Sequence, residues 1–411
     1  MKKLHYFYFF FFLLVSVSCS QDDSTIIVEV NPSDVQGANV PVSVAIDLPS
    51  RFRNTDVNQI SVSLSTSDGA SENIPGQLTR EGSGEVRLWW VLPETRTDAN
   101  TSWAATFQST TDASTPDFLW QDDQGKHLDL IYDGKKVFRY EYELDSQFVL
   151  GETLTARNRV FYHLYDLDGT RLITNGYEPG TWSHHRGIMI GWRDVMYKGQ
   201  KLSFWGMEQL TTQKHIEFVE LTAGPVLARV KSRIHWNDST GQTIIDEIRT
   251  ATIYHLPSPA IALLDFSSTL TAANGDVSLA GDPEHGGVQY RAHGDVADEK
   301  PGSRKPTYYF HKDGIDPTVD HNLPWVGMEY GLDHKTYSIV DMNGEGNPSP
   351  AVWSAYRDYG RFGPYFSKDL ADGESFDVNF RFFISESEMP SRKEIDAMHA
   401  SYLNPPATGV N

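Results

Sequence analysis

A two-residue period of apolar side chains recurs along most of the chain and constrains the fold more than any other feature. Between Thr25 and about Thr110, runs such as IIVEV, VPVSVAIDL and ISVSLST alternate apolar with polar or small residues. Turn-forming stretches such as NPSD and REGSGE separate these runs. Successive side chains of a β-strand point to opposite faces, so such alternation between frequent turns is typical of an all-β sandwich. We therefore predict a small N-terminal β-sandwich domain over residues 19–110.

Longer runs of the same type continue from Phe118 to about Ile384. Examples are RVFYHLYDLDG, HIEFVELTAGPVLARVKSRIHW and FDVNFRFFI, with DG, NG and SG turns between them. This pattern predicts a large antiparallel β-sandwich of two broad sheets over residues 118–403. The polar stretch STTDASTPD at 109–117 is expected to link it to the smaller domain.

The C-terminal segment is the one place where the spacing of apolar residues becomes helical. Ser391 and Glu394 form a capping-box pattern, and Ile395, Met398 and Tyr402 fall on one helical face. Asn404-Pro405-Pro406 then ends the helix. We expect a short C-terminal helix that covers a sheet.

The first residues have the form of an export signal. Two lysines precede an apolar run over residues 6–17, which is shorter than the roughly 20 residues of a membrane-spanning helix. The tripeptide before Cys19 resembles a lipobox, and Ser20–Asp23 resembles the acidic export tag of Bacteroidetes surface lipoproteins. We predict a signal peptide over 1–18 and lipidation of Cys19, which gives an outer membrane lipoprotein facing the cell surface or periplasm. An ordinary signal peptide is the alternative. With this single cysteine there is no intramolecular disulfide.

The charge of the chain limits its partners. The formal net charge is −20 and the isoelectric point is near 5.0. Such a field repels nucleic acid and anionic membrane surfaces, so neither is expected as a partner. A negatively charged substrate would need a local basic pocket. Aromatic residues make up 12% of the chain, which fits a β-rich core or platforms that stack on sugars.

Two histidines and an arginine stand side by side in the segment TWSHHRGIMIGW, residues 181–192. Neighbouring residues of a strand point to opposite faces, so His184 and His185 share a site only if the chain turns there. Gly180 and Gly187 permit such a turn. The pair is then either part of a reactive site or a structural pair that satisfies buried backbone groups.

A second polar junction is GDPEHGGVQYRAHGD, residues 281–295. If 288–293 is a strand, Val288, Tyr290 and Ala292 face one side, and Gln289, Arg291 and His293 face the other. The polar face is either exposed to solvent or lines a cleft.

A third junction is AYRDYGRFGPYF, residues 355–366, in which Arg357 and Arg361 stand among five aromatic residues. Aromatic rings stack on the C–H faces of sugars, and arginine binds carboxylate or sulfate with two parallel hydrogen bonds. The alternative is a packed turn whose arginines pair with nearby acids such as Asp358.

These segments together resemble the PmoA-like family, also labelled methane oxygenase PmoA and otherwise a domain of unknown function. The resemblance covers Lys126 to Ile384 and is most specific in HHRG at 184–187, FWG at 204–206 and EHGGVQYR at 284–291. The lead before the histidines is Gly-Thr-Trp-Ser here, where the family has an Asp-His-Pro-like lead. The resemblance implies a galactose-mutarotase-like β-supersandwich from polysaccharide-degrading bacteria. Oxygenase chemistry is not expected, because a copper oxygenase site needs several convergent imidazoles.

We expect a carbohydrate-active enzyme that eliminates from uronic-acid-containing oligosaccharides, as a lyase or dehydratase. Removing the proton next to a uronate carboxylate requires cationic groups that neutralise the carboxylate, and a base whose pKa is near neutrality, for which histidine is the usual choice. An acid must then protonate the leaving oxygen. The predicted catalytic residues are His184, His185, His293 and Tyr290, and the predicted substrate-binding residues are Arg186, Trp192, Arg291, Arg361 and Tyr365.

Three alternatives stay open at this stage. A glycoside hydrolase would need two facing carboxylates, for which Glu284 and Glu329 are candidates. A surface lipoprotein that binds glycans without catalysis would use the aromatic residues but would not need clustered histidines. A metal-dependent enzyme would draw on the histidine and Glu-His pairs, although their spacing is not that of strong metal motifs. Its ligands would come from His184, His185, Glu284, His285 and His293. No metal or other cofactor is expected.

Overall fold

The computed structural model describes residues 24–31, 34, 36–66, 73–93, 102–110, 117–144, 157–177, 180–182, 184–207 and 209–410. Strands take up 53% of the chain and helices 7%, so the predicted all-β class is confirmed. The predicted signal peptide, Cys19 and most of the predicted linker lie outside the described residues. Within these ranges, no helix is long and apolar enough to cross a membrane.

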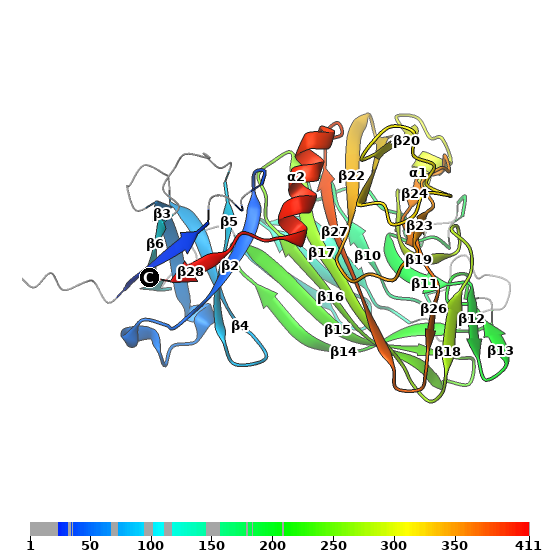
Figure 1. Cartoon of the computed structure of the whole chain (residues 1–411), viewed down its shortest axis with the longest axis horizontal. Helices are drawn as coiled ribbons and strands as arrows, with labels where there is room; N and C mark the ends of the chain where they lie inside the picture. The colour runs from blue at the N-terminus through cyan, green and yellow to red at the C-terminus, as the bar shows by residue number, and fades with distance from the viewer. Residues whose placement is uncertain are drawn as a thin grey trace, which may run out of the picture.

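Seven antiparallel strands form the N-terminal sheet, in the order β2-β5-β4-β3-β6-β1-β28. Its core is separate from that of the rest of the chain and includes Leu64, Leu88, Trp90 and Phe107. The last strand, β28, pairs with β1, so the end of the chain returns to this sheet, as Figure 1 shows at the label C. The strands are β1 (Thr25–Val30), β2 (Val40–Ile46), β3 (Ile60–Thr66), β4 (Ile74–Arg80), β5 (Val86–Leu92), β6 (Ser102–Ser109) and β28 (Thr408–Val410), with short 3-10 helices η2 (Ser50–Phe52) and η3 (Val57–Gln59).

The rest of the chain forms a large antiparallel sandwich around one extensive core (Figure 1). One broad sheet has the order β14-β15-β16-β17-β27-β22-β21-β20. Its strands are β14 (Thr212–Ala223), β15 (Leu227–Asn237), β16 (Thr243–Tyr254), β17 (Ala260–Ala272), β27 (Ser375–Ser385), β22 (Lys335–Asn343), β21 (Trp325–Leu332) and β20 (Arg304–Phe310).

The opposing sheet has seven strands in the order β24-β19-β11-β10-β9-β8-β7. Its strands are β24 (Arg361–Phe362), β19 (Gly286–Arg291), β11 (Ile188–Trp192), β10 (Phe161–Leu164), β9 (Lys135–Glu141), β8 (His127–Tyr132) and β7 (Phe118–Asp123). Two small sheets complete the sandwich, with strands β13 (Gln200–Leu202), β12 (Asp194–Tyr197), β18 (Val277–Ala280), β26 (Lys368–Leu370), β23 (Val352–Trp353) and β25 (Pro364–Tyr365). Helix α1 (Gly294–Ala297) follows β19.

The C-terminal helix α2 (Arg392–Leu403) forms as its sequence pattern predicts. The Ser391 side chain accepts a hydrogen bond from the Glu394 backbone N–H, and the Glu394 carboxylate accepts one from the Ser391 N–H. Ile395 is buried, and Met398 and Tyr402 pack with it against Val340 on the broad sheet. The helix therefore covers the sheet beside the N-terminal part of the chain (Figure 1).

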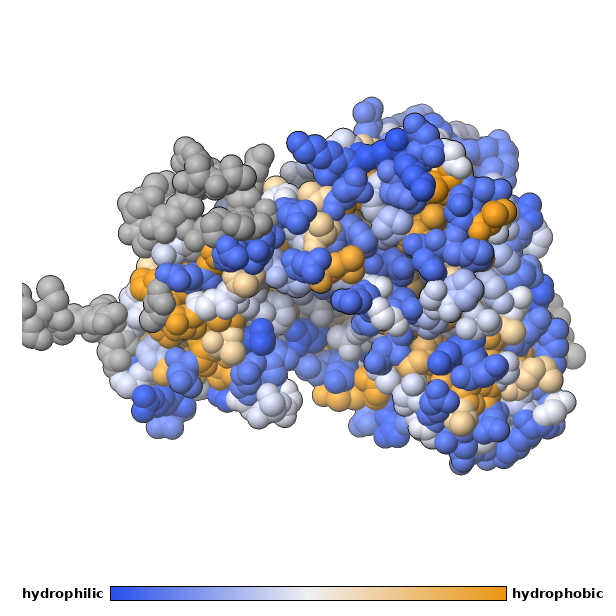
Figure 2. Space-filling view, viewed as in Figure 1, coloured by the Kyte–Doolittle hydropathy of each residue, from blue (hydrophilic) through white to orange (hydrophobic). Residues whose placement is uncertain are grey.

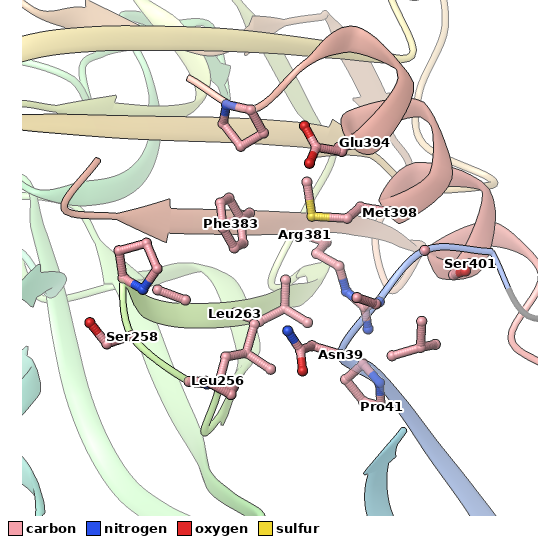
Figure 3. A pocket seen from close by; sticks show the side chains of 17 residues that line it. Asn39, Pro41, Leu256, Ser258, Leu263, Arg381, Phe383, Glu394, Met398 and Ser401 are labelled. Carbon is pink, nitrogen blue, oxygen red and sulfur yellow. The ribbon is translucent and has the colours of Figure 1, made fainter. Parts of the chain in front are cut away.

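A cavity of about 270 Å³ lies where α2, the start of β2 and the loop before β17 meet. Figure 3 shows Leu256, Leu263 and Phe383 on its walls. The Arg381 guanidinium in this cavity binds both carboxylate oxygens of Asp265, at 2.6 and 2.8 Å. The charge of Arg381 is thus already compensated. The surface where α2 meets the N-terminal sheet is a mixture of hydrophilic residues and small hydrophobic patches (Figure 2).

In the sheet β24-β19-β11-β10-β9-β8-β7, successive side chains of each strand alternate between the sandwich core and the outward face. Val288 and Tyr290 of β19 share one face, as predicted, and that face belongs to the sandwich core, whereas Gln289 and Arg291 lie on the other face. Arg291 pairs with Arg361 of the edge strand β24, so both arginines lie on the same outward face.

Candidate functional site

The structure brings the three polar junctions of the sequence together on the outward face of the sheet that contains β19 and β24. The His185 ring centroid lies 5.9 Å from that of Tyr359 and 5.4 Å from that of Trp205. The guanidinium carbon of Arg291 lies 5.1 Å from the Tyr359 centroid, and that of Arg361 lies 5.5 Å from it. His184, His185, Arg291, Tyr359 and Arg361 therefore form one cluster, which we call the His185 cluster.

Arg361 is fully buried in this cluster, and its hydrogen-bond partners among the described residues are all neutral. Its Nη1 donates to Gln289 Oε1 at 3.0 Å and to Ser354 Oγ at 3.2 Å. Its Nε and Nη2 donate to the Tyr359 hydroxyl oxygen at 3.1 and 2.9 Å. The guanidinium is thus held in one orientation, although no carboxylate of the described residues forms an ion pair with it.

Arg291 is the least satisfied cation of the cluster, with only 1% of its surface exposed. Its Nη2 donates to the Thr181 carbonyl at 2.9 Å, but its buried Nε and Nη1 have no hydrogen-bond partner among the described residues. Burial, together with the charge of Arg361, lowers the pKa of Arg291 to about 10. Unmet N–H donors on a buried cation are costly, and a bound anion would satisfy them.

His185 is buried beside these arginines and is neutral. Burial, followed by the neighbouring His184 and the charge of Arg361, lowers the pKa of His185 well below its usual range. Neither ring nitrogen has a hydrogen-bond partner among the described residues. Burial and the charge of Arg159 likewise lower the pKa of His184, to about 3. A neutral imidazole with a free nitrogen can accept a proton.

The chain turns at the histidines, as the flanking glycines allow. The backbone N–H of His185 donates to the Trp182 carbonyl at 3.0 Å, and the Asn175 side chain donates to the His185 carbonyl at 2.6 Å. Gly187 has a φ of +35°, and a Cβ there would lie 1.9 Å from the Tyr162 carbonyl oxygen. Only glycine fits at this position, and the resulting turn directs the His185 ring toward Tyr359.

Tyr359 is a central residue of the cluster that the sequence analysis did not select. Its ring contacts His185 and both arginines. Its oxygen accepts two N–H groups from Arg361, and no described residue accepts its own hydroxyl hydrogen. That hydrogen is available to a ligand. The only signal for Tyr359 in the sequence is its place among the five aromatic residues of 355–366, which favours Tyr365 equally.

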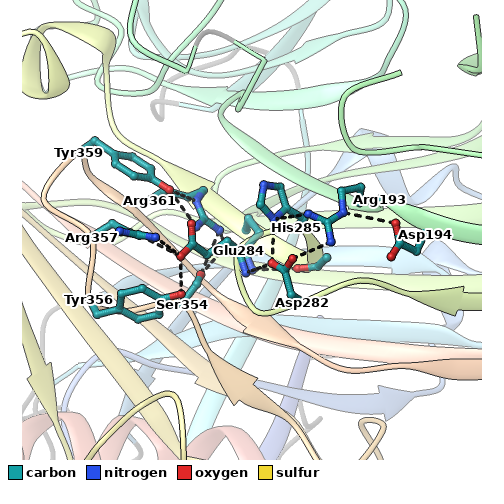
Figure 4. Close-up of polar contacts among 12 residues, drawn as sticks. Arg193, Asp194, Asp282, Glu284, His285, Ser354, Tyr356, Arg357, Tyr359 and Arg361 are labelled. Carbon is teal, nitrogen blue, oxygen red and sulfur yellow. Dashed lines mark hydrogen bonds and ion pairs between the residues drawn. The ribbon is translucent and has the colours of Figure 1, made fainter. Parts of the chain in front are cut away.

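A layer of ion pairs lies beside the cluster (Figure 4). Glu284 accepts hydrogen bonds from the Tyr356 hydroxyl at 2.8 Å and from Arg357 Nε at 2.9 Å. Burial raises the pKa of Glu284, but the hydrogen bonds from Arg357 and Tyr356 and the charges of Arg357 and Arg361 together bring it below its usual value. His285 contacts Asp282 at 2.7 Å, and Asp282 also pairs with Arg193. These acids are therefore already paired.

Two predicted site residues are in the core, and we correct their assignment. Trp192 is fully buried, packs 6.1 Å from Trp236, and donates its indole N–H to the Phe366 carbonyl at 2.8 Å. Tyr290 is also fully buried, and its hydroxyl shares a hydrogen bond of 2.8 Å with that of Tyr330. The alternation that turns Arg291 outward turns these even-numbered residues inward, so neither reaches a substrate.

Three other predicted residues have local structural roles. Arg186 donates to the Gly176 carbonyl at 2.7 Å, and its guanidinium lies 4.3 Å from the Tyr177 centroid. His293 is the N-cap of α1 and accepts a hydrogen bond from the Asp295 N–H. The half-buried Tyr365 ring covers Gly286, where a Cβ would lie 2.6 Å from a ring carbon.

Replacing Trp192 with alanine is expected to destabilise the fold by about 3–5 kcal/mol, because it leaves a large cavity in the core. Chemical denaturation followed by circular dichroism measures this. Trp182→Ala is the matched control, since that tryptophan is 53% exposed and its loss should change stability by about 0.5 kcal/mol or less. Equal stabilities for the two variants would contradict the core assignment of Trp192.

The metal and hydrolase alternatives find little support in the geometry. Among the described residues, no group of three or more His, Cys, Asp or Glu side chains converges as metal ligands. Glu284 contacts Tyr356 and Arg357, whereas Glu329 binds Arg304 at 3.0 Å and the Met389 N–H. Both carboxylates are therefore already engaged by groups of the fold.

Comparison with known proteins gives a family but no function. The sequence model of a family described as "Family of unknown function (DUF6807)" matches residues 127–400, which is more than half of the chain. No curated protein matches. The solved structure of the Slr1438 protein from Synechocystis sp. PCC 6803 is 13% identical, with 68% of this chain and 99% of that chain covered, and its TM-score of 0.30 is too low to support an argument. The PmoA-like assignment made from HHRG and EHGG is wrong, because no such family matches. The chain belongs to the DUF6807 family of unknown function.

Proposed function

We propose that this protein is a carbohydrate-active enzyme that eliminates from uronic-acid-containing oligosaccharides, as a lyase or dehydratase. The observation that carries the proposal is one buried cluster with three unusual groups. Counting partners among the described residues, it contains a guanidinium with two unmet N–H donors, a second guanidinium with only neutral partners, and a neutral histidine with free ring nitrogens. These groups are Arg291, Arg361 and His185. Such a cluster is prepared for an anion that carries an abstractable proton.

Arg291 and Arg361 are assigned to the carboxylate of the uronate. When the proton next to a carboxylate leaves, negative charge accumulates on the carboxylate oxygens. Fixed cationic donors in a site shielded from water stabilise that charge more effectively than water does. The hydrogen bonds that hold Arg361 to Gln289 and Tyr359 keep its guanidinium oriented before the substrate arrives.

His185 is assigned as the base and Tyr359 as the acid. In the proposed step the imidazole of His185 takes the proton from C5 of the uronate, the C4–C5 double bond forms, and the bond from C4 to its oxygen breaks. The leaving oxygen takes the hydroxyl hydrogen of Tyr359 and departs as water or as the hydroxyl of the neighbouring sugar. Two N–H donors from Arg361 stabilise the resulting phenolate.

A matched pair of substrates tests this assignment. We would incubate the purified protein with a uronic-acid oligosaccharide and with the same oligosaccharide after reduction of its carboxyl groups, and follow both by mass spectrometry. The proposal predicts loss of water or chain cleavage for the uronate alone. Equal processing of the reduced sugar would overturn the role of the arginines. A uronate that binds but stays intact would favour the non-catalytic glycan-binding lipoprotein.

The pH dependence of kcat/KM should differ from that of an ordinary histidine base. Because burial keeps the pKa of His185 well below 6.5, the imidazole of the free enzyme stays neutral as the pH falls through 6.5. We therefore expect kcat/KM to show no acidic loss there and to fall only at lower pH. A bound carboxylate stabilises the imidazolium, so the acidic limb of kcat should lie at higher pH than that of kcat/KM. A half-maximal kcat/KM near pH 6.5 would contradict this assignment of the base.

A further inference from the structure

Trp182 combines an exposed side chain with an unfavourable backbone conformation. Its side chain is 53% exposed, and its φ is +55°. Bulky aromatic residues rarely adopt this left-handed region, and such strain is found most often at functional sites. An exposed indole contributes little to folding, so folding alone does not account for a tryptophan at this position.

The backbone on both sides of Trp182 is tied to the His185 cluster. The Thr181 N–H donates to Asp298 Oδ1 at 3.1 Å, and the Thr181 carbonyl accepts from Arg291 at 2.9 Å. The Trp182 carbonyl accepts the His185 N–H at 3.0 Å. Asp298, Arg291 and His185 therefore hold the strained residue in place, and the position of its ring is linked to that of the anion-binding arginine.

The indole lies at the edge of the cluster, next to the reactive groups. Its ring is within 20° of parallel to the His185 ring, at 6.4 Å between centroids, and its centroid lies 6.2 Å from that of Tyr359. One part of the ring thus faces the cluster while the other part faces solvent. The next sugar of a chain whose uronate occupies the cluster would meet this exposed part.

We propose that Trp182 is the stacking platform for the sugar that neighbours the uronate, so that the site selects oligosaccharides over single uronic acids. This inference rests on the proposed function and adds a specificity-determining residue to it. The C–H face of a pyranose stacks on an indole, and the interaction does not require charge. It therefore complements the anionic contact at Arg291 and Arg361.

Calorimetry with a uronic acid monosaccharide and a tetrasaccharide tests this, using the full mature chain. We expect Trp182→Gly to weaken tetrasaccharide binding by about tenfold and to leave monosaccharide binding unchanged, because one stacked ring is lost. Trp182→Phe should retain most of the affinity. The Tm of Trp182→Gly should equal or exceed that of the wild type, because glycine adopts positive φ without strain. Trp120→Phe, on the edge strand β7, is the control for a tryptophan outside the cluster.

Equal affinities of Trp182→Gly and wild type for the tetrasaccharide would overturn the stacking role. An equal loss of affinity for both ligands, with a lowered Tm, would also overturn the stacking role, because that pattern indicates a merely structural residue. If the wild type binds the tetrasaccharide through Trp182 but does not convert it, the elimination fails and the stacking role stands. If it converts the sugar and Trp182→Gly does so with unchanged length preference, the stacking role fails and the elimination stands.

Discussion

Replacing His185 with alanine is expected to lower the kcat of the elimination by about 10²–10⁴-fold, which is the usual contribution of a positioned general base. Binding of the uronate should be largely retained, because Arg291 and Arg361 remain. The ring is buried and its nitrogens make no described hydrogen bond, so its removal breaks no polar contact of the fold. Single-turnover kinetics and uronate titration of the variant measure the two effects separately.

Two controls make this result specific. Imidazole added to His185→Ala should restore part of the rate, since the cavity left by the ring can admit a free base. His215→Ala removes a histidine on β14 whose pKa burial also lowers, to about 4, but which contacts Tyr140 and lies outside the cluster. That variant should keep the wild-type rate. A His185→Ala protein that is folded by circular dichroism and fully active would exclude His185 as the base.

Replacing Arg291 with glutamine is expected both to weaken uronate binding and to stabilise the fold. Loss of charge-assisted hydrogen bonds worth about 1.5–3 kcal/mol corresponds to an increase in KM of about 10–150-fold. Removing a buried cation with two unmet donors should raise the Tm by about 2–4 °C. Michaelis kinetics and calorimetric unfolding measure these two changes.

Arg249 provides the matched control for this variant. It is as deeply buried as Arg291, but its guanidinium binds Glu247 at 2.7 and 2.9 Å. Arg249→Gln should therefore destabilise the protein by about 3–5 kcal/mol, because it leaves a buried carboxylate unpaired. If both variants lowered stability alike, Arg291 would have a structural partner, and its assignment to a ligand would be wrong.

Local sequence patterns were sufficient to predict the β-strands, helix α2 and the side chains that share a face of a strand. The alternation in 288–292 predicted which side chains share a face, and the capping box predicted α2. The same alternation also distinguishes the two tryptophans of TWSHHRGIMIGW, because Ile188, Ile190 and Trp192 share the core face. This alternation excludes Trp192 from the site and leaves Trp182, in the turn, as the tryptophan that can contact a ligand.

Contacts between distant segments could not be predicted from these patterns. The sequence places Arg186 and Arg291 in equally polar surroundings, and only the fold shows that the first stacks on Tyr177 while the second has unmet donors. The choice between Tyr365 and Tyr359 depends in the same way on the pairing of β24 with β19. The return of β28 to the N-terminal sheet, nearly 380 residues after β1, likewise has no local signal.

The central claim is that the His185 cluster forms a C4–C5 double bond in a uronic acid. Such a bond is conjugated with the carboxylate and absorbs ultraviolet light, so the most direct measurement follows absorbance while the wild type and His185→Ala act on a panel of uronic-acid oligosaccharides. We predict that an ultraviolet band grows with the wild type and is abolished in the variant, and that mass spectrometry shows loss of water or of a sugar. Sugars that keep their mass and gain no absorbance across the panel would contradict the account.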